Sequence, residues 1–329
     1  MKRGFLRTIG AICLAATALA SIAQVQAADV TIRVASAFND GTDMIRAAMR
    51  FGEIVEEKSG GAIDVQFFAN GQMGGEKDNL EALKIGEIEM GVFGTYPIVT
   101  LAPAYSFFDA PFVFRDKDHF YAVYKGELGD GVRKIFKEQN GIHELGIMGR
   151  GYRHITSNKP IEFVDDLAGV KMRMGQSKPF IEAFAETGAV VVPIALPELF
   201  TSLKLGVVSA SEGPYDQIYT FKLHEAQSHL AITGHLYATS LWLMNQEFYD
   251  GLSEEHRKIV DEAAAEALAL GDKMSEESAE QLLAKLQEEG MTVTKPDYAA
   301  FMQKVRPAID RLFAQDWTVT TAAAIEAVK

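Results

Sequence analysis

The first third of the chain switches between two hydrophobic periodicities. Val30, Ile32 and Val34 stand at every second position, which predicts a strand with one buried face. Helical spacing follows as far as the stop signal Gly60-Gly61, and the same pair of patterns then repeats. The expected strands are residues 30–34, 63–67 and 88–93, and the expected helices are residues 45–55 and 80–85. A β-α-β-α-β order predicts a parallel sheet covered by helices.

A second α/β set follows in the middle of the chain. Before it, residues 114–139 predict two helices broken at Gly126, and residues 143–148 predict a strand. The second set has expected strands at 170–174, 190–193 and 207–211, helices at 177–187 and 198–205, and later strands at 230–232 and 240–245. The chain therefore contains two α/β halves, and we expect their junction near Gly149-Arg150-Gly151.

The segment from Ser253 to Glu289 predicts one unusually long helix, or two nearly collinear ones. It has no proline and a single glycine, Gly271, and Ser253 is a favourable capping residue. At 1.5 Å per residue it would span roughly 55 Å, which exceeds the width of a domain of about 150 residues. Its apolar positions are mostly alanine without a strict heptad, which disfavours a coiled coil. We expect the helix to cross both halves, with Gly271 as a candidate bend.

The N-terminus has the features of a secretory signal peptide. Three basic residues precede an apolar run from Ile9 to Ala23, and the small-residue pattern Val25-Gln26-Ala27 follows. The run is shorter than the roughly 18 residues of a membrane span, so an uncleaved anchor is the less favoured alternative. We expect residues 1–27 to be removed during export.

Composition and charge narrow the function classes. The full chain has 329 residues, of which 48% are apolar, and a formal net charge of −13. Loss of residues 1–27 removes three basic residues and no acidic one, and a remainder with a charge of about −16 is a poor partner for nucleic acid or anionic membranes. The only cysteine, Cys13, lies in the signal segment, which excludes disulfides and cysteine nucleophiles from the mature chain.

Motifs for catalysis or phosphate binding do not occur in the sequence. There is no G-x-S-x-G, no G-x-x-x-x-G-K-[ST], and no G-x-G-x-x-G after a strand. His224 and His229 bracket a sequence similar to a zinc-protease motif, but their spacing of five does not place them on one helix face. We therefore expect binding without a metal or another cofactor, and no enzymatic activity.

Several longer sequence segments, taken together, match the pattern of one protein family. Residues 151–214 contain GYRHITSNKPI, DDLAGVKMRM, GAVVVPIALPELFTSLKLG and VVSASEGP. NGQMGGEKDNLEALKIGEIEMGV and DAPFVFRDKDHF precede them, and a long helix follows LSEEHRKIVDEAA. Together these segments resemble the extracytoplasmic solute-binding proteins of TRAP transporters, a family first described for four-carbon dicarboxylate uptake. The resemblance covers essentially the whole mature chain.

The resemblance implies a two-lobed α/β periplasmic binding protein fold, in which each lobe has a central β-sheet flanked by helices and the long C-terminal helix crosses both lobes. Lobe I would comprise residues 28–150 and about 239–278, and lobe II residues 151–238 and about 279–329. The lobes would close on one small organic acid. The protein, a monomer in the periplasm, would deliver this acid to the membrane subunits of a TRAP permease driven by an ion gradient.

The resemblance also implies two arginines that contact the ligand. Arg173 stands where the family has its carboxylate-binding arginine. The strand pattern puts Arg173 on the face opposite Met172 and Met174. A guanidinium has a planar fork that matches a carboxylate with two parallel hydrogen bonds. Arg153 is implied as the second basic ligand residue, and an ion pair between the lobes or on the surface is its alternative role.

Glu212 and Gly213 fall where the family has polar ligand contacts or groups that close the lobes. The family reads Val-Asp-Gly-x-Glu-x-Pro there, whereas residues 208–214 read Val-Ser-Ala-Ser-Glu-Gly-Pro. Gly213 has no side chain to donate a hydrogen bond. We therefore expect one ligand contact to be absent or made by the backbone, and the pocket to be wider at this point.

The ends of the expected strands supply further candidate ligand contacts. Asn39 follows the first strand and Tyr96 follows the third, and open α/β sheets bind ligands in the loops at strand carboxyl ends. Tyr215, Asp216 and Tyr237 lie near the expected boundary between the lobes and are weaker candidates.

Two other functions remain open from the sequence. A secreted enzyme acting on organic acids would need a nucleophile with a base or a set of metal ligands, and the sequence has neither pattern. A receptor could also serve a membrane sensor kinase, because kinase and permease both recognise a surface. These residues do not determine whether the ligand is a monocarboxylate, a dicarboxylate, a sugar acid or a sulfonate.

Overall fold

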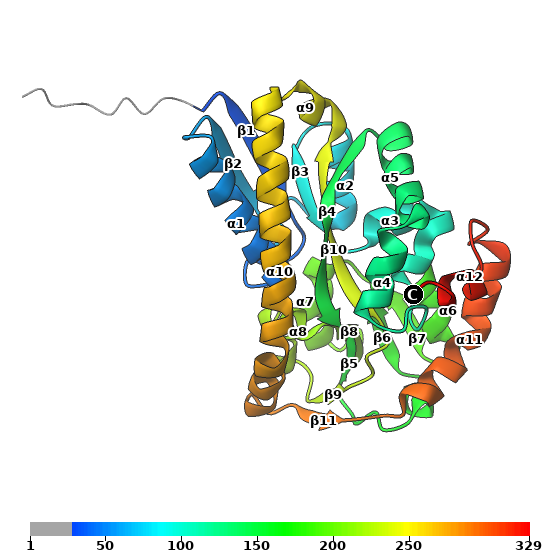
Figure 1. The fold of residues 1–329 in the computed structure, drawn as a ribbon. Helices are drawn as coiled ribbons and strands as arrows, with labels where there is room; N and C mark the ends of the chain where they lie inside the picture. Colours follow the sequence, from blue (N-terminus) through cyan, green and yellow to red (C-terminus); the bar gives the residue numbers. More distant parts are fainter. Residues whose placement is uncertain (1–27) are drawn as a thin grey trace, which may run out of the picture.

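The computed structural model describes residues 28–329, and the predicted signal peptide lies outside the described residues. Two β-sheets lie one above the other in Figure 1, each with helices around it, and the long helix α10 (Glu254–Glu288) runs past both. No helix between residues 28 and 329 is long and apolar enough to cross a membrane. The predicted fold class, two α/β lobes with a long C-terminal helix that crosses them, is confirmed.

The first sheet is mixed and has the strand order β2-β1-β3-β10-β4. Its strands are β1 (Val30–Ala35), β2 (Ile63–Phe68), β3 (Met90–Phe93), β4 (Ile142–Tyr152) and β10 (Tyr237–Asn245). β1 pairs in parallel with β2 and β3, as predicted, whereas β10 runs antiparallel to β3 and β4. β1, β2 and β3 are joined by helical crossovers, which make consecutive strands parallel. β10 enters this sheet from the second lobe without such a crossover, so it can run antiparallel to its neighbours.

The second sheet has six strands in the order β11-β9-β5-β8-β6-β7. They are β5 (His154–Ser157), β6 (Lys171–Met174), β7 (Val190–Pro193), β8 (Ala210–Gly213), β9 (His229–Ala231) and β11 (Thr292–Thr294). β8 begins at Ala210 instead of residue 207, because Val207 is exposed in the preceding turn. β6 pairs in parallel with β7 and β8 on its two sides. Its carboxyl end therefore lies inside a parallel sheet, where α/β proteins commonly bind ligands.

Helices surround both sheets, and each predicted helix is present (Figure 1). Those of the first lobe are α1 (Asp43–Lys58), α2 (Glu76–Lys84), α3 (Tyr96–Leu101), the 3-10 segment η1 (Pro103–Asp109), α4 (Lys117–Tyr124), α5 (Glu127–Asn140) and α9 (Gln246–Gly251). Those of the second are η2 (Val164–Leu167), α6 (Lys178–Ala185), η3 (Leu196–Glu198), α7 (Leu199–Lys204), α8 (Tyr215–Thr220) and η4 (Leu223–Glu225). Gly126, the predicted break, is the N-cap of α5.

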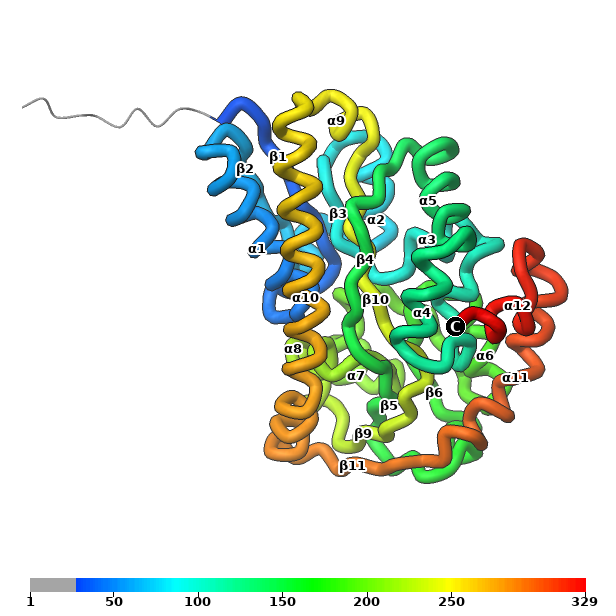
Figure 2. Tube along the Cα trace, in the orientation of Figure 1, coloured from blue at the N-terminus to red at the C-terminus, as the bar shows by residue number. Residues whose placement is uncertain are grey.

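The two lobes are joined by short connections. β4 continues through the predicted junction at Gly149-Arg150-Gly151, and only Arg153 separates it from β5 in the other sheet. Figure 2 shows the traces of β4 and β10 running from one lobe toward the other beside α10. These segments form the hinge region, and Arg153 lies within it.

α10 is continuous through Gly271, the candidate bend. The Ser253 hydroxyl caps the first turn by accepting a hydrogen bond from the His256 amide at 3.0 Å. At Gly271, a Cβ would lie 2.5 Å from Met148 Sδ and 3.0 Å from Ala47 Cβ. Close packing of α10 on β4 and α1 therefore explains the glycine, and the helix is not interrupted there.

The C-terminal segment contacts both lobes. β11 extends the second sheet, and α11 (Tyr298–Gln315) packs against α6 of the second lobe. Trp317 and Ile325, the latter in α12 (Ala322–Glu326), are buried in a cluster of the first lobe that includes Phe107. Residues 298–326 contact both lobes, so the structure does not assign this segment to one of them. The predicted lobe bounds therefore stay a prediction.

Candidate ligand-binding site

A cavity of about 80 Å³, here called the inner cavity, lies between the two sheets. The first lobe contributes Phe38, Glu76, Gly94, Thr95, Tyr96 and Asp109. The second lobe contributes Arg173, Gly175, Gln176, Ser177, Phe180, Leu196, Glu212 and Gln217, and the hinge region contributes Arg150, Arg153, Leu236, Ala238 and Thr239. The wall combines three arginines with three carboxylates. Charged side chains are seldom buried without a partner or a function, so this wall is the candidate site.

Arg173 presents a charged fork to the inner cavity from the carboxyl end of β6. Its side chain is buried, and its Nε donates a hydrogen bond to the Ile194 carbonyl at 2.9 Å. The guanidinium forms no other hydrogen bond within residues 28–329. Burial lowers the pKa of Arg173 to about 10, so the group stays charged at neutral pH. Its two terminal nitrogens are therefore free to bind an anion.

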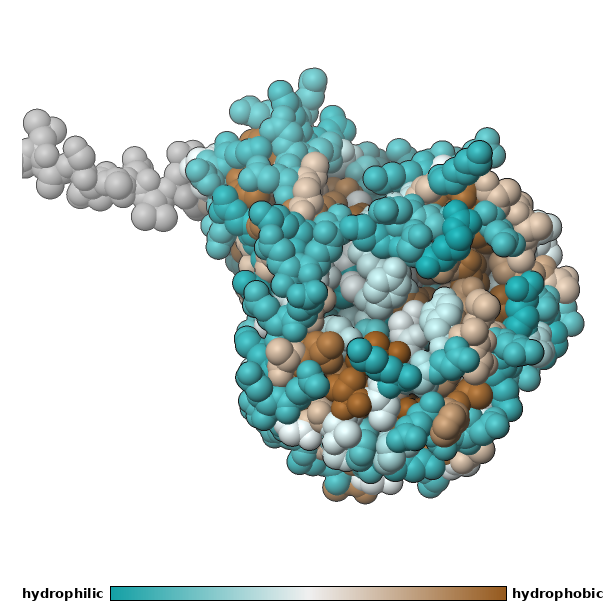
Figure 3. All heavy atoms as spheres, turned by 60° about the horizontal axis from the view of Figure 1, so that its bottom comes forward, coloured by the Kyte–Doolittle hydropathy of each residue, from teal (hydrophilic) through white to brown (hydrophobic). Residues whose placement is uncertain are grey.

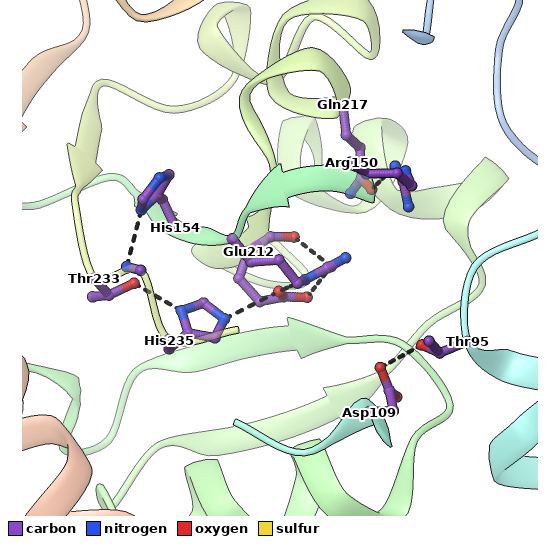
Figure 4. A network of polar contacts seen from close by, with 10 residues as sticks. Thr95, Asp109, Arg150, His154, Glu212, Gln217, Thr233 and His235 are labelled. Atoms are coloured by element: carbon purple, nitrogen blue, oxygen red, sulfur yellow. Dashed lines mark hydrogen bonds and ion pairs between the residues drawn. The ribbon is translucent and has the colours of Figure 1, made fainter. Parts of the chain in front are cut away.

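Arg153 is paired with a carboxylate of lobe II. Its Nε and Nη2 donate to the Glu212 carboxylate, with 2.7 Å between Nη2 and Oε1, and Figure 4 shows Glu212 at the centre of this network. Burial alone would raise the pKa of Glu212, but the Arg153 guanidinium holds that pKa well below its usual range. Nε2 of His235 lies 3.4 Å from the same carboxylate. The buried ion pair joins the hinge region to lobe II, and so differs from the surface or interlobe pair considered from the sequence.

Arg150 is the third cation of the wall. Its guanidinium stacks over the Phe38 ring, 4.3 Å from the centroid, and its Nη2 donates to Gln217 Oε1 at 3.3 Å. Figure 4 shows this pair apart from the pair formed by Thr95 and Asp109. The Arg150 Nε and the Gln217 Nε2 are buried, and neither has a hydrogen-bond partner in the described part of the chain. Both donors remain available at this position.

Two carboxylates of the first lobe complete the charged wall. Glu76 accepts a hydrogen bond from the Gly94 amide at 2.7 Å, and Asp109 accepts one from the Thr95 hydroxyl. Burial raises the pKa of both groups, that of Asp109 to about 6. Neither carboxylate has a cationic nitrogen within 4.0 Å among residues 28–329. Each therefore keeps lone pairs that a donor in the cavity could use.

The structure separates the predicted ligand contacts into two groups. Arg173, Arg153, Glu212 and Tyr96 line the inner cavity. Gly213 does not, and a Cβ there would lie 2.8 Å from Gln217 Nε2, so the Gln217 side chain fills the room expected at this position. Asn39 also lies elsewhere, because its Nδ2 donates across the lobes to the Thr220 carbonyl at 2.9 Å.

The remaining candidates, Tyr215, Asp216 and Tyr237, line a larger cavity of about 560 Å³, here called the outer cavity. The Tyr215 ring stacks on His154 with 4.5 Å between centroids. Figure 3 shows the molecule hollowed on one face, with side chains of intermediate hydropathy inside the hollow and hydrophilic ones around it. The two cavities share Arg150, so these three residues lie next to the inner cavity and outside its wall.

Sequence analysis missed several charged or polar residues of the wall, among them Glu76, Asp109, Arg150 and Gln217. Glu76 and Asp109 belong to two segments that carried the family resemblance, NGQMGGEKDNLEALKIGEIEMGV and DAPFVFRDKDHF, so a signal existed there. Arg150 and Gln217 belong to no motif and no amphipathic pattern. They contact each other only because β4 and α8 meet in the folded chain.

Comparison with known proteins gives an independent test of the resemblance. The family model described as bacterial extracellular solute-binding protein, family 7, or DctP, matches residues 34–316. The chain belongs to this family. Family 7 proteins are solute receptors of TRAP transporters, so the alternative of a secreted enzyme is wrong.

Curated relatives and solved structures resemble this chain over most of their length. A solute-binding protein of Verminephrobacter eiseniae is 32% identical over 283 residues, 85% of this chain and 84% of its own. The sugar acid binding protein DctPAm from Advenella mimigardefordensis, solved with galactonate, is 28% identical with a TM-score of 0.87, covering 92% of this chain and 99% of that one. A TRAP periplasmic solute binding protein from Sulfurospirillum deleyianum, solved with succinate, is likewise 28% identical with a TM-score of 0.87, covering 92% and 100%. The predicted resemblance is confirmed.

His154, which lines the outer cavity at the start of β5, should make the stability of this family 7 protein depend on pH. Burial lowers the pKa of His154 to about 3, and its Nδ1 accepts a hydrogen bond from the Gly234 amide at 3.1 Å. Because the unfolded chain binds this proton near pH 6.5, the native state loses stability as the pH falls below that value, by about 1.4 kcal/mol per pH unit from this residue.

Urea unfolding at pH 7 and pH 5 checks this expectation. His154→Asn keeps an acceptor for the Gly234 amide but does not titrate. Between pH 7 and pH 5 its free energy of unfolding should therefore fall by about 2 kcal/mol less than that of the parent. His256→Asn, at a half-buried position in the first turn of α10, should behave like the parent. Equal pH dependence of His154→Asn and the parent would contradict the neutral, buried state of His154.

Proposed function

We propose that this family 7 protein is a periplasmic receptor that holds one small organic acid between its two lobes and delivers it to a TRAP permease. The observation that carries the proposal is the buried guanidinium of Arg173, which is charged and has two free nitrogens facing a cavity walled by both lobes. A ligand carboxylate matches this fork with two parallel hydrogen bonds. Arg153, Glu212 and Tyr96 lie close enough to contribute further contacts.

Closure of the lobes would complete the site. The wall of the inner cavity is divided between the lobes, so an acid bound to Arg173 would be enclosed only when Glu76 and Asp109 of the first lobe approach it. The hydrogen bond from Asn39 to the Thr220 carbonyl joins the lobes at another point. We assign Asn39 to closure, and we keep Tyr215, Asp216 and Tyr237 as candidates that act beside the ligand.

The permease, the periplasmic location and the monomeric state belong to the proposal. The relatives' names support a periplasmic TRAP receptor, and the sequence of residues 1–27 supports export. The receptor would dock on the membrane subunits with the lobes closed and release the acid as they open.

Thermal unfolding with a library of organic acids tests the proposed function. An acid at 100 times its dissociation constant adds roughly 2.7 kcal/mol to stability, which should raise the melting temperature by several degrees. Arg173→Ala should abolish the increase, and Lys171→Ala, an exposed position on the same strand, should retain it. If no small organic acid raises the melting temperature, the proposed function is wrong.

Closure of the lobes predicts a change in solution scattering. The radius of gyration should decrease when the acid found in that screen is added at saturation, because the lobes approach each other around it. Arg173→Ala with the same acid should keep the radius of the free protein. An unchanged scattering curve for the saturated parent would contradict closure without contradicting binding.

A further inference from the structure

The balance of charge in the inner cavity limits how many carboxylates a ligand can bring. Three guanidiniums face three carboxylates, so the wall has no surplus of positive charge when all six groups are ionised. Arg153 and Glu212 neutralise each other. A ligand carboxylate on Arg173 then leaves Arg150 as the one remaining guanidinium of the wall to balance the charges of Glu76 and Asp109. A second ligand carboxylate would raise the excess to two buried negative charges around the single remaining guanidinium, that of Arg150, which is strongly unfavourable.

Proton uptake can balance one added charge more easily than two. Burial already raises the pKa of Asp109 to about 6, so a bound monoanion needs only one proton on this carboxyl to restore neutrality. Asp216, whose charge acts on Arg150 from the side of the outer cavity, adds another carboxylate and increases the imbalance. The charges of the wall therefore favour a ligand with a single carboxylate.

The polar groups without partners indicate what the rest of the ligand carries. Glu76 and Asp109 are acceptors with spare lone pairs, and each already accepts a hydrogen bond from its own lobe. The Arg150 Nε and the Gln217 Nε2 are buried donors without partners within residues 28–329. A ligand hydroxyl satisfies both kinds of group, because it donates one hydrogen bond and accepts others. A methylene group satisfies neither, and a second carboxylate can only accept.

We propose that the ligand is a polyhydroxylated monocarboxylate of the aldonate type, with its carboxylate on Arg173 and its hydroxyls between Glu76 and Asp109 on one side and Arg150 and Gln217 on the other. Dicarboxylates without hydroxyls are poor ligands of this site. The assignment rests on the proposed function and narrows it to one class of acid.

Calorimetry at pH 7.5 with small acids that carry hydroxyls and small acids that lack them tests the assignment. The hydroxylated probes are D-erythronate, L-threonate, D-gluconate and D-galactonate, and the probes without hydroxyls are butyrate, succinate and glutarate. At least one hydroxylated acid should bind 10-fold or more tightly than every probe without hydroxyls, because several hydrogen bonds to charged groups depend on it. If succinate, glutarate or butyrate binds as tightly as the best aldonate, the assignment is wrong and the proposed function stands. If none of the seven binds, the assignment is wrong, and the melting-temperature screen with the wider library decides separately whether the proposed function stands.

Two nearly isosteric variants identify the groups that recognise the hydroxyls. Glu76→Gln and Asp109→Asn should each weaken the best aldonate by about 10- to 100-fold. The affinity of each variant for butyrate should stay within threefold of the parent's or increase, because a charge that repels the butyrate carboxylate has been removed. Glu81→Gln, on the exposed face of α2, is the matched control and should change neither ligand. Loss of both ligands by the same factor in both variants would show a structural effect and overturn the assignment.

Discussion

Replacing Arg173 by alanine is expected to weaken binding of the organic acid by about 30-fold to several-thousand-fold, because truncating a buried, hydrogen-bonded charge costs on the order of 2 to 5 kcal/mol. The protein's own charge of about −16 repels an anion at long range, but screening in physiological salt limits this repulsion to roughly 8 Å. Affinity must therefore come from groups at the cavity. Arg173 has two free nitrogens there.

Lysine should not replace Arg173. The ammonium group is a point charge that cannot form two parallel hydrogen bonds to one carboxylate. Burial lowers the pKa of Arg173 to about 10, and the same burial would move the lower pKa of a lysine toward neutrality. Calorimetry on Arg173→Ala, Arg173→Lys and the control Lys171→Ala measures these effects. Binding by Arg173→Lys within about threefold of the parent would show that the planar fork does not hold the ligand.

Glu212→Gln should be the most destabilising single substitution in the site. It removes a buried negative charge and leaves Arg153 without compensation in the hinge region, and breaking a buried pair in this way costs about 3 to 5 kcal/mol. Two hydrogen bonds join Arg153 to the carboxylate, and His235 contacts the same group at 3.4 Å. The free energy of unfolding in urea at pH 7 is the measurement.

A double substitution separates the ion pair from the packing around it. Glu212→Leu combined with Arg153→Met removes both charges, so it should recover most of the loss seen in Glu212→Gln. The matched control is the exposed pair of Arg311 and Glu186, in which Glu186→Gln should cost less than about 1 kcal/mol. Destabilisation by Glu212→Gln of less than 1 kcal/mol would mean that Arg153 is not buried against this carboxylate in solution.

The pH dependence of the Glu212 contribution has a definite sign. Arg153 lowers the folded-state pKa of Glu212 below that of the unfolded chain, so the stabilisation is complete above about pH 4.5 and is lost as the pH falls further. The contribution of His154 is lost in a higher range, between its unfolded pKa near 6.5 and its folded pKa of about 3. Acid should therefore destabilise the protein in two overlapping stages.

Local patterns determined most of the elements of this protein. The two-residue period gave β1 and β2, and the capping residue Ser253 marked the start of α10 correctly. Such features depend on neighbours within one or two turns or along one strand, so the sequence contains them directly. The family resemblance added Arg173, Arg153 and Glu212, whose positions in the motif carry over from one member to the next.

The roles of the arginines depended on contacts that no local pattern contains. Arg153 is 59 residues from Glu212, and Arg150 is 67 residues from Gln217, yet each pair forms hydrogen bonds. From the sequence, the resemblance implied Arg173 as the carboxylate-binding arginine and Arg153 as a second ligand residue, with an ion pair as the alternative role of Arg153. The crossing from β4 to β5 places Arg153 beside β8 and its Glu212, whereas Arg173 meets only a backbone carbonyl. Tertiary structure therefore decided which arginine stays free to bind an anion, because neutralising a buried charge requires a partner within about 4 Å, and only the fold sets that distance.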